Sequence, residues 1–184
     1  METYLINESI EKERIHLNFQ QTLVHYRFSI LLLVVSIFSI TNGLQNISTL
    51  DFDLNNIQTK ISFFFIIVSL ISFFYQRNQL KLISVETYED GNYLFERIIE
   101  LAKQKKWSIQ SVSHNYLILN TKRSFPVSRL FISESGGENI YVFYKPNRIL
   151  IRSVFDFNKS RGFVVSKGEN SQNESAIFLK LNTK

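Results

Sequence analysis

Two apolar runs without an ionisable side chain constrain the fold of this chain most strongly. They extend over residues 28–40 and 61–75, only twenty residues apart, in a sequence that is otherwise polar and basic. An α-helix needs roughly 20 predominantly apolar residues to cross the hydrocarbon core of a bilayer. Both runs reach that length when their uncharged flanks are counted. The pattern therefore predicts a membrane hairpin of two transmembrane helices.

The hairpin divides the chain into three parts. We expect a cytosolic N-terminal helix over residues 1–27, the hairpin with its external loop over residues 28–76, and a cytosolic α+β domain over residues 77–184. Apolar residues recur at seven-residue spacing from Ile10 to Val24, which predicts that the first part is a helix running into the membrane.

The basic residues around the runs predict the orientation. Three Lys or Arg side chains lie shortly before the first run and two shortly after the second, whereas the connecting loop has only Lys60. Cytoplasmic segments carry the excess of Lys and Arg in membrane proteins. The abundance of Asn, Lys, Ile and Phe is typical of an AT-rich bacterial genome. We therefore expect both termini in the cytoplasm, residues 45–58 outside, and the protein in the bacterial inner membrane.

Small residues follow a heptad spacing inside both runs. Ser29 and Ser36 are seven residues apart in the first run, as are Ser62 and Ser69 in the second. Small residues allow transmembrane helices to approach closely, so this spacing predicts the face on which the two helices pack. The alternative is a mildly polar line that faces a water path once several copies assemble. Selective transport normally needs ionisable groups inside the membrane, and their absence from both runs disfavours that function.

The sequence after Arg77 changes to short alternating segments separated by Gly, Pro, Asn and Asp. Asp90-Gly91 is typical of a helix start, and the apolar stripe that follows predicts a helix to about Lys105. Ser171 to Glu174 is a capping box and predicts a closing helix. Strands are expected over residues 107–112, 116–121, 129–134, 140–144, 148–155 and 163–166. Together these elements predict an antiparallel sheet with helices packed on it, an α+β fold.

The positive charge is concentrated in one part of this domain. Residues 122–167 carry nine Lys or Arg and three Asp or Glu, a net charge of +6, compared with +5 for the whole chain. Side chains alternate along a strand, so Arg148 and Arg152 share one face with Leu150 and are expected to leave the core together. Such a face can bind phosphate groups.

Three interpretations of the basic segment remain open. It is a solvated face that also contacts anionic lipid headgroups, or it binds a phosphate-containing ligand, or it binds long nucleic acid. The third is disfavoured because no recognised nucleic-acid module is present. For the second, the expected phosphate contacts are Arg123, Arg129, Lys145, Arg148, Arg152, Arg161 and Lys167. The aromatic residues expected to stack on a base are Trp107, Tyr141, Phe143 and Tyr144.

Catalysis is the least supported class of function. The chain has no cysteine, and its three histidines, His16, His25 and His114, have no metal-ligand spacing. It also lacks a Gly-rich phosphate loop and a nucleophile elbow. We therefore expect no enzyme activity, no metal and no cofactor.

Three stretches of the C-terminal part resemble a small domain of unknown function that recurs in bacterial membrane proteins. They are residues 137–142, residues 147–153, and residues 167–170 with Asn173. The resemblance covers residues 93–182 and implies no activity.

At the level of architecture, two spans followed by a basic cytosolic domain resemble the membrane effectors of bacterial cyclic-oligonucleotide defence, in CBASS and in type III CRISPR systems. The resemblance implies that a cyclic oligonucleotide made on phage infection binds the cytosolic domain. Binding then favours a homo-oligomer whose transmembrane helices disrupt the inner membrane. The alternative is a non-catalytic membrane accessory or scaffold protein whose soluble domain docks a protein partner or anionic lipid. The sequence leaves both open.

Overall fold

The structure, a computed structural model, describes residues 3–45, 57–121, 137–157 and 168–182. It divides into two compact units. One is the helical unit, Phe19–Gln79, and the other is the α+β unit, which combines Met1–Asn18 with Leu80–Lys184.

The helical unit consists of two long helices packed against each other, α2 (Phe19–Gln45) and α3 (Ile57–Gln79). Within them, residues 19–41 and 59–79 are long and apolar enough to cross a membrane. The helices extend beyond both apolar runs because the flanking residues continue the helical hydrogen bonding. The expected helical hairpin is confirmed at this level.

The N-terminal helix is shorter than the sequence pattern predicts. Helix α1 spans Thr3–Glu11, and the chain is then non-helical until α2 begins at Phe19. Glu13 has a left-handed backbone conformation with φ of 49°, and Arg14 forms an antiparallel bridge with Lys81. This pairing takes residues 13–15 out of the helix, so the prediction of one helix over residues 1–27 is wrong.

The α+β unit contains a five-stranded antiparallel sheet in the order β1-β5-β4-β3-β2. Its strands are β1 (Ile83–Glu86), β2 (Ser108–Val112), β3 (Tyr116–Asn120), β4 (Glu138–Lys145) and β5 (Arg148–Phe155). The predicted antiparallel sheet is confirmed, with β1 as a strand that the sequence pattern missed. The expected strands over residues 129–134 and 163–166 lie outside the described residues.

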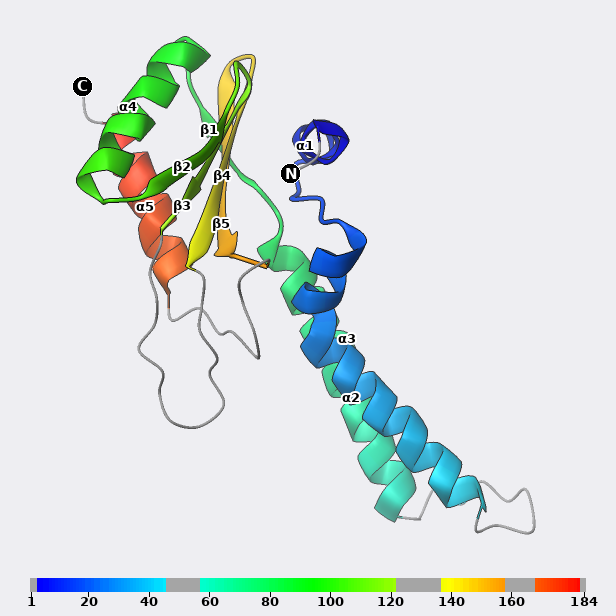
Figure 1. Cartoon of the computed structure of the whole chain (residues 1–184). Coiled ribbons are helices and arrows are strands. Elements are labelled where there is room, and N and C mark those ends of the chain that lie inside the picture. Colours follow the sequence, from blue (N-terminus) through cyan, green and yellow to red (C-terminus); the bar gives the residue numbers. More distant parts are fainter. Residues whose placement is uncertain (1–2, 46–56, 122–136, 158–167, 183–184) are drawn as a thin grey trace. The chain divides into compact units, whose positions relative to one another are not determined.

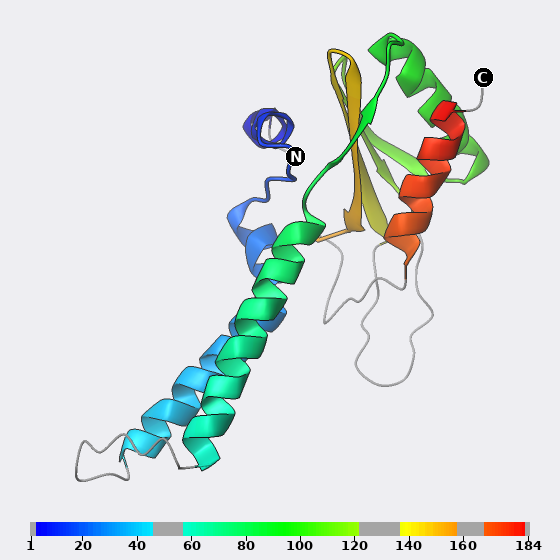
Figure 2. The ribbon, with the colours of Figure 1, turned by 180° about the vertical axis from the view of Figure 1, so that it is seen from behind.

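Helices α4 (Gly91–Gln104) and α5 (Glu169–Asn182) cover one face of the sheet, as Figures 1 and 2 show. Asp90 caps α4 by accepting a hydrogen bond from the Asn92 amide at 3.1 Å. The predicted apolar stripe of α4 is buried. The core between these helices and the sheet includes Leu94, Ile98, Leu101, Leu117, Leu119, Ile140, Val142, Ile149, Ile151 and Ile177.

Arg148 and Arg152 lie together on the face of the sheet away from the core under α4 and α5, as predicted, but this face also carries buried side chains. Tyr141, Phe143 and Leu150 are buried there, and the rings of Tyr141 and Phe143 stack with their centroids 6.2 Å apart. Helix α1 lies on this side of the sheet, opposite α4 and α5 (Figures 1 and 2). Arg148 and Arg152 therefore lie on either side of buried Leu150 and are only partly exposed.

Helix α5 also differs from its predicted start. It begins two residues before Ser171, and the Gln172 amide donates to the Gly168 carbonyl at 3.1 Å. The carboxylate of Glu174 instead accepts a hydrogen bond from the Ser153 amide on β5 at 2.9 Å. The predicted capping box is wrong because Glu174 faces the sheet.

Candidate functional site

The turn between β4 and β5 brings two of the predicted phosphate contacts together. Lys145 and Arg148 are cross-strand partners on either side of a two-residue turn formed by Pro146 and Asn147. Asn147, the second residue of this turn, has a left-handed backbone conformation (φ 64°), which asparagine tolerates. The turn therefore fixes one ammonium and one guanidinium group side by side at this end of the sheet.

Both cations contact the same carboxylate oxygen. Lys145 Nζ lies 3.2 Å from Glu13 Oε1, and Arg148 Nη2 lies 2.7 Å from it. All three side chains remain partly exposed to solvent, so each ion pair is screened and modest in strength. The arrangement nevertheless demonstrates that one anionic oxygen fits between Lys145 and Arg148.

Backbone hydrogen bonds tie Glu13 to the segment that follows α3. The Ile15 amide donates to the Leu80 carbonyl at 2.8 Å, and the Leu82 amide donates to the Glu13 carbonyl at 3.0 Å. These two bonds flank the bridge between Arg14 and Lys81. We call residues 13–15 and 80–82 the clamp, because they join the segment before α2 to the segment after α3.

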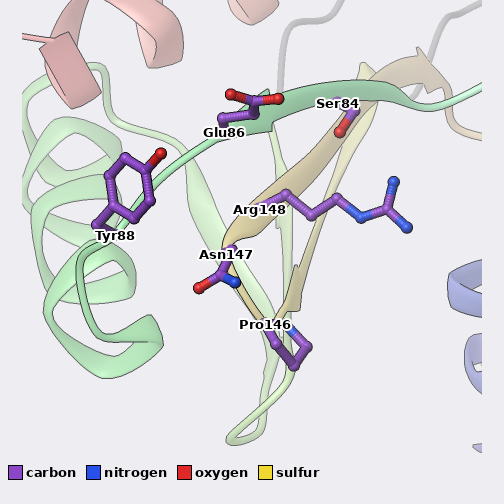
Figure 3. Close-up of a pocket in the computed structure, with 6 residues that line it drawn as sticks. All are labelled: Ser84, Glu86, Tyr88, Pro146, Asn147 and Arg148. Carbon is purple, nitrogen blue, oxygen red and sulfur yellow. The ribbon is translucent and has the colours of Figure 1, made fainter.

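An open pocket of about 330 Å³ lies beside the turn. It is lined by Ser84, Glu86, Tyr88, Pro146, Asn147 and Arg148 (Figure 3). Tyr88 is 94% exposed, and the Arg148 side chain extends away from its ring (Figure 3). The pocket thus has an accessible aromatic ring and one cationic side chain, Arg148, in its lining.

Arg152 does not join this site. It lies four residues after Arg148 on the same strand, a separation of roughly 13 Å at the usual rise of a strand. Its guanidinium lies 3.7 Å from Glu174. Burial raises the pKa of Glu174 above its ordinary value, while the Ser153 amide and Arg152 oppose that shift. Arg148 and Arg152 therefore pair with two different carboxylates, Glu13 and Glu174.

The other predicted contacts, Arg123, Arg129, Arg161 and Lys167, lie outside the described residues. The described residues that flank their segments are at the end of the sheet opposite the turn. Glu138 pairs with Phe155 at that end, seven positions along β4 from Lys145. Of the described predicted contacts, Lys145 and Arg148 thus lie at one end of the sheet, and Arg152 lies in the middle of β5.

Three of the four aromatic residues expected to stack on a base are buried, and the fourth, Tyr144, is half-buried. Trp107, Tyr141 and Phe143 are buried. The ring of Tyr144 packs against Gly91, where an added Cβ would lie only 2.8 Å from it. Burial also raises the pKa of Tyr141 to about 12. The sequence analysis missed Tyr88, because an exposed tyrosine outside the basic segment gives no signal until β1 brings it beside the turn.

A buried polar network lies at the end of the sheet away from the turn. Asn173 Nδ2 donates to Glu138 Oε2 at 2.6 Å and to Ser153 Oγ at 3.2 Å, and Ser153 Oγ donates to Asn170 at 3.1 Å. On the other face, Asn120 donates to Asn139 at 2.7 Å and to Asp156 at 3.2 Å. Many of these residues belong to the stretches that carry the resemblance to a bacterial domain of unknown function. The network satisfies buried polar groups and so fixes the strand ends.

In the helical unit, polar side chains lie between the helices and apolar ones lie outside. Ser29 Oγ donates to Gln76 Oε1 at 2.6 Å, and Ser69 Oγ donates to the Ser29 carbonyl at 2.7 Å. His25 and Gln76 each contact the other's backbone carbonyl at 2.8 Å. Ser36 and Ser62 are fully buried. The outer surface consists of large apolar side chains, including Ile30, Leu31, Val34, Ile37, Phe38, Phe64, Ile67, Leu70, Ile71 and Phe74.

Titratable side chains of the described residues lie close together near the N-terminus; His16 and Glu8 are such a pair. Among the described residues there is no group of three or more His, Cys, Asp or Glu side chains that could hold a metal ion. His16 lies 3.4 Å from Glu8, and burial lowers the pKa of His16 whereas the Glu8 charge opposes that shift. The hydrogen bond from Lys12 is the main cause that lowers the pKa of Glu8. These contacts link α1 to the segment after it.

Comparisons with protein-family models, with curated proteins and with solved structures find no match for this chain.

Proposed function

We propose that this chain is a membrane effector whose α2–α3 hairpin lies in the bacterial inner membrane and whose α+β unit binds a phosphate-containing ligand. The ligand class is a cyclic oligonucleotide made on phage infection. Ligand binding favours a homo-oligomer, and the assembled hairpins disrupt the membrane. The protein performs no catalysis in this scheme.

The main support for the proposal is that the helical unit buries polar side chains and exposes apolar ones. Ser29, Ser36, Ser62 and Ser69 are buried between the helices. Large apolar side chains cover the outside. In water this arrangement exposes a large continuous apolar surface, which soluble monomers rarely do. In a bilayer the same surface contacts lipid, and small residues and interhelical hydrogen bonds hold the helices together.

The chain segments that form the α+β unit support a hairpin with both ends on one side of the membrane. Residues before α2 and residues after α3 belong to this one compact unit. Two spans return the chain to the side from which it started. The excess of Lys and Arg outside the connecting loop favours the cytoplasm as that side.

The ligand part of the proposal rests on the turn between β4 and β5. Lys145 and Arg148 converge on one oxygen of Glu13, and the exposed Tyr88 ring borders the same pocket. A guanidinium and an ammonium group suit a phosphate oxygen, and an aromatic face suits a nucleobase. The net charge of +6 over residues 122–167 adds a field that attracts anions.

Thermal unfolding of the full-length protein in nanodiscs tests the ligand class. The protein is heated with and without cyclic di-, tri- and tetranucleotides, and a ligand at 100 times its dissociation constant is expected to add about 2.7 kcal/mol of stability. Arg148→Glu should abolish the shift. Lys103→Glu, which reverses an exposed charge on α4, should preserve it. The absence of a shift with every nucleotide of the panel contradicts the proposal.

The ion pairs of three predicted phosphate contacts favour a second function. Lys145 and Arg148 are already paired with Glu13, and Arg152 with Glu174. Paired cations suit a structural role, as in a membrane accessory or scaffold protein that docks a protein partner or anionic lipid. In the same experiment, this function predicts stabilisation by nanodiscs that contain anionic lipid and none by nucleotides.

A further inference from the structure

We propose that Glu13 is an internal occupant of the anion site formed by Lys145 and Arg148, and that a bound anion replaces it and opens the clamp. The inference rests on the proposed ligand binding at that site. It adds the step by which the ligand acts on the segments that continue into α2 and α3.

The first observation is the way in which Glu13 is held. Its Oε1 atom accepts from Lys145 and from Arg148, as one oxygen of a phosphate group would. Its side chain is partly exposed, so a dissolved anion can compete with it. A phosphate group carries more negative charge than a carboxylate and offers more oxygens, so it should bind the two cations more strongly.

The second observation is the backbone of Glu13. Its φ of 49° lies in the left-handed region, which is unfavourable for a residue with a side chain. The surrounding contacts must hold this conformation. The contacts that do so include the ion pairs of Glu13, the two backbone hydrogen bonds of the clamp, and the hydrogen bond from the Arg14 amide to the Ser9 carbonyl at 3.2 Å. Loss of the ion pairs therefore weakens the clamp.

The third observation is the position of the clamp in the chain. Leu80 directly follows the last residue of α3, and three residues separate Ile15 from Phe19, where α2 begins. The clamp thus fixes the spacing between the chain that enters the hairpin and the chain that leaves it. When it opens, this constraint is lifted, and the two helices are free to change their packing or their partners.

Hydrogen exchange of the full-length protein in nanodiscs tests the clamp without any ligand. The amides of Ile15 and Leu82 donate the two clamp hydrogen bonds and should exchange slowly. Glu13→Gln should speed their exchange by about threefold, as expected for the loss of partly exposed ion pairs, and Glu13→Lys by more. Glu11→Gln removes the same charge from the exposed end of α1 and should change nothing. Unchanged exchange in both Glu13 variants overturns the proposal.

A charge-swap variant distinguishes loss of the ion pair from misfolding of the single variants. In Glu13→Lys/Arg148→Glu, the attraction across the site is restored with its signs exchanged. Exchange at Ile15 and Leu82 should then return toward the rate of the unsubstituted protein. If the double variant exchanges as fast as Glu13→Lys alone, the ion pair does not control the clamp.

Cysteine crosslinking then tests displacement by an anion. Arg14 and Lys81 are bridge partners flanked by hydrogen bonds, and such pairs have their Cα atoms about 4.5 Å apart, which suits a disulfide. The chain has no other cysteine, so Arg14→Cys/Lys81→Cys reports on the clamp alone. A cyclic nucleotide that stabilises the protein should slow disulfide formation by about threefold or more. The same measurement in vesicles with and without anionic lipid distinguishes a lipid headgroup from a free ligand.

The outcomes separate this inference from the proposed function. A nucleotide that stabilises the protein while disulfide formation is unchanged overturns the displacement of Glu13 and leaves the proposed ligand binding intact. Fast exchange in Glu13→Gln, with no response to any nucleotide, supports the clamp and contradicts the ligand class. Slower crosslinking with the nucleotide, together with fast exchange in Glu13→Gln, supports both.

Discussion

In the α+β unit, large apolar side chains such as Phe143 and Leu150 are fully buried, whereas in the helical unit Phe64 and Leu70 are more than half exposed and serines are buried instead. In both units, buried polar side chains such as Ser69 and Asn120 make hydrogen bonds. In the function that we propose, the exposed apolar side chains of the helical unit contact lipid and the surface of the α+β unit contacts water.

The largest difference between the two units is expected when the same substitution, Phe→Ala, is made in each and the unfolding free energy is measured. Phe143→Ala removes a fully buried ring from the α+β unit and should lower its unfolding free energy by about 3–5 kcal/mol. Phe64→Ala removes a ring that is 61% exposed on α3 and should change stability by only about 0.5 kcal/mol. Denaturant unfolding of both variants in nanodiscs measures the difference. Equal losses of unfolding free energy in the two variants would contradict the difference between the units.

The next largest effect is expected for a charge on the outer face of the hairpin. Leu70→Lys places an ammonium group in the middle of α3, which costs about 2.5–3.5 kcal/mol on insertion scales. Val112→Lys on β2 is the matched control, because both side chains are 52% exposed. The share of protein retained in membranes after a carbonate wash should fall for Leu70→Lys alone. Equal retention of the two variants would contradict a lipid-facing α3.

The smallest effect concerns pH and belongs to the α+β unit alone. Because burial raises the pKa of Glu174 in the folded protein, the folded state holds this proton more tightly than the unfolded state. The contribution of Glu174 to stability therefore falls as pH rises through the ordinary pKa of a glutamate and then through the raised one. Glu174→Gln should remove this fall, whereas Glu96→Gln on the exposed side of α4 should keep it. Unfolding midpoints between about pH 4 and 8 provide the measurement.

The sequence predicted those elements whose patterns are local. The apolar runs predicted α2 and α3, the heptad serines predicted their packing face, and Asp90-Gly91 predicted the start of α4. Each pattern depends on residues within a few turns of one another. Strand β1 was missed because its four residues are too short to give a clear period, and they form a strand only by pairing with β5.

The candidate site could be predicted only in part, because it depends on long-range pairing. Lys145 and Arg148 are joined by a local turn, and charge counting found them. Glu13 is more than a hundred residues away in sequence, and nothing in its neighbourhood indicates a contact with β4. The burial of Tyr141 and Phe143 also could not be predicted, because it depends on what covers the second face of the sheet.

The accessibility of single cysteines tests the central claim most directly, since the natural chain contains none. Ile67→Cys on α3 and Ile109→Cys on β2 replace side chains that are 55% and 43% exposed. In sonicated, detergent-free membranes, a water-soluble maleimide should label Ile109→Cys quickly and Ile67→Cys hardly at all, and both should react fully after denaturation in SDS. Equal labelling of the two cysteines in detergent-free membranes would contradict a hairpin that lies in the bilayer.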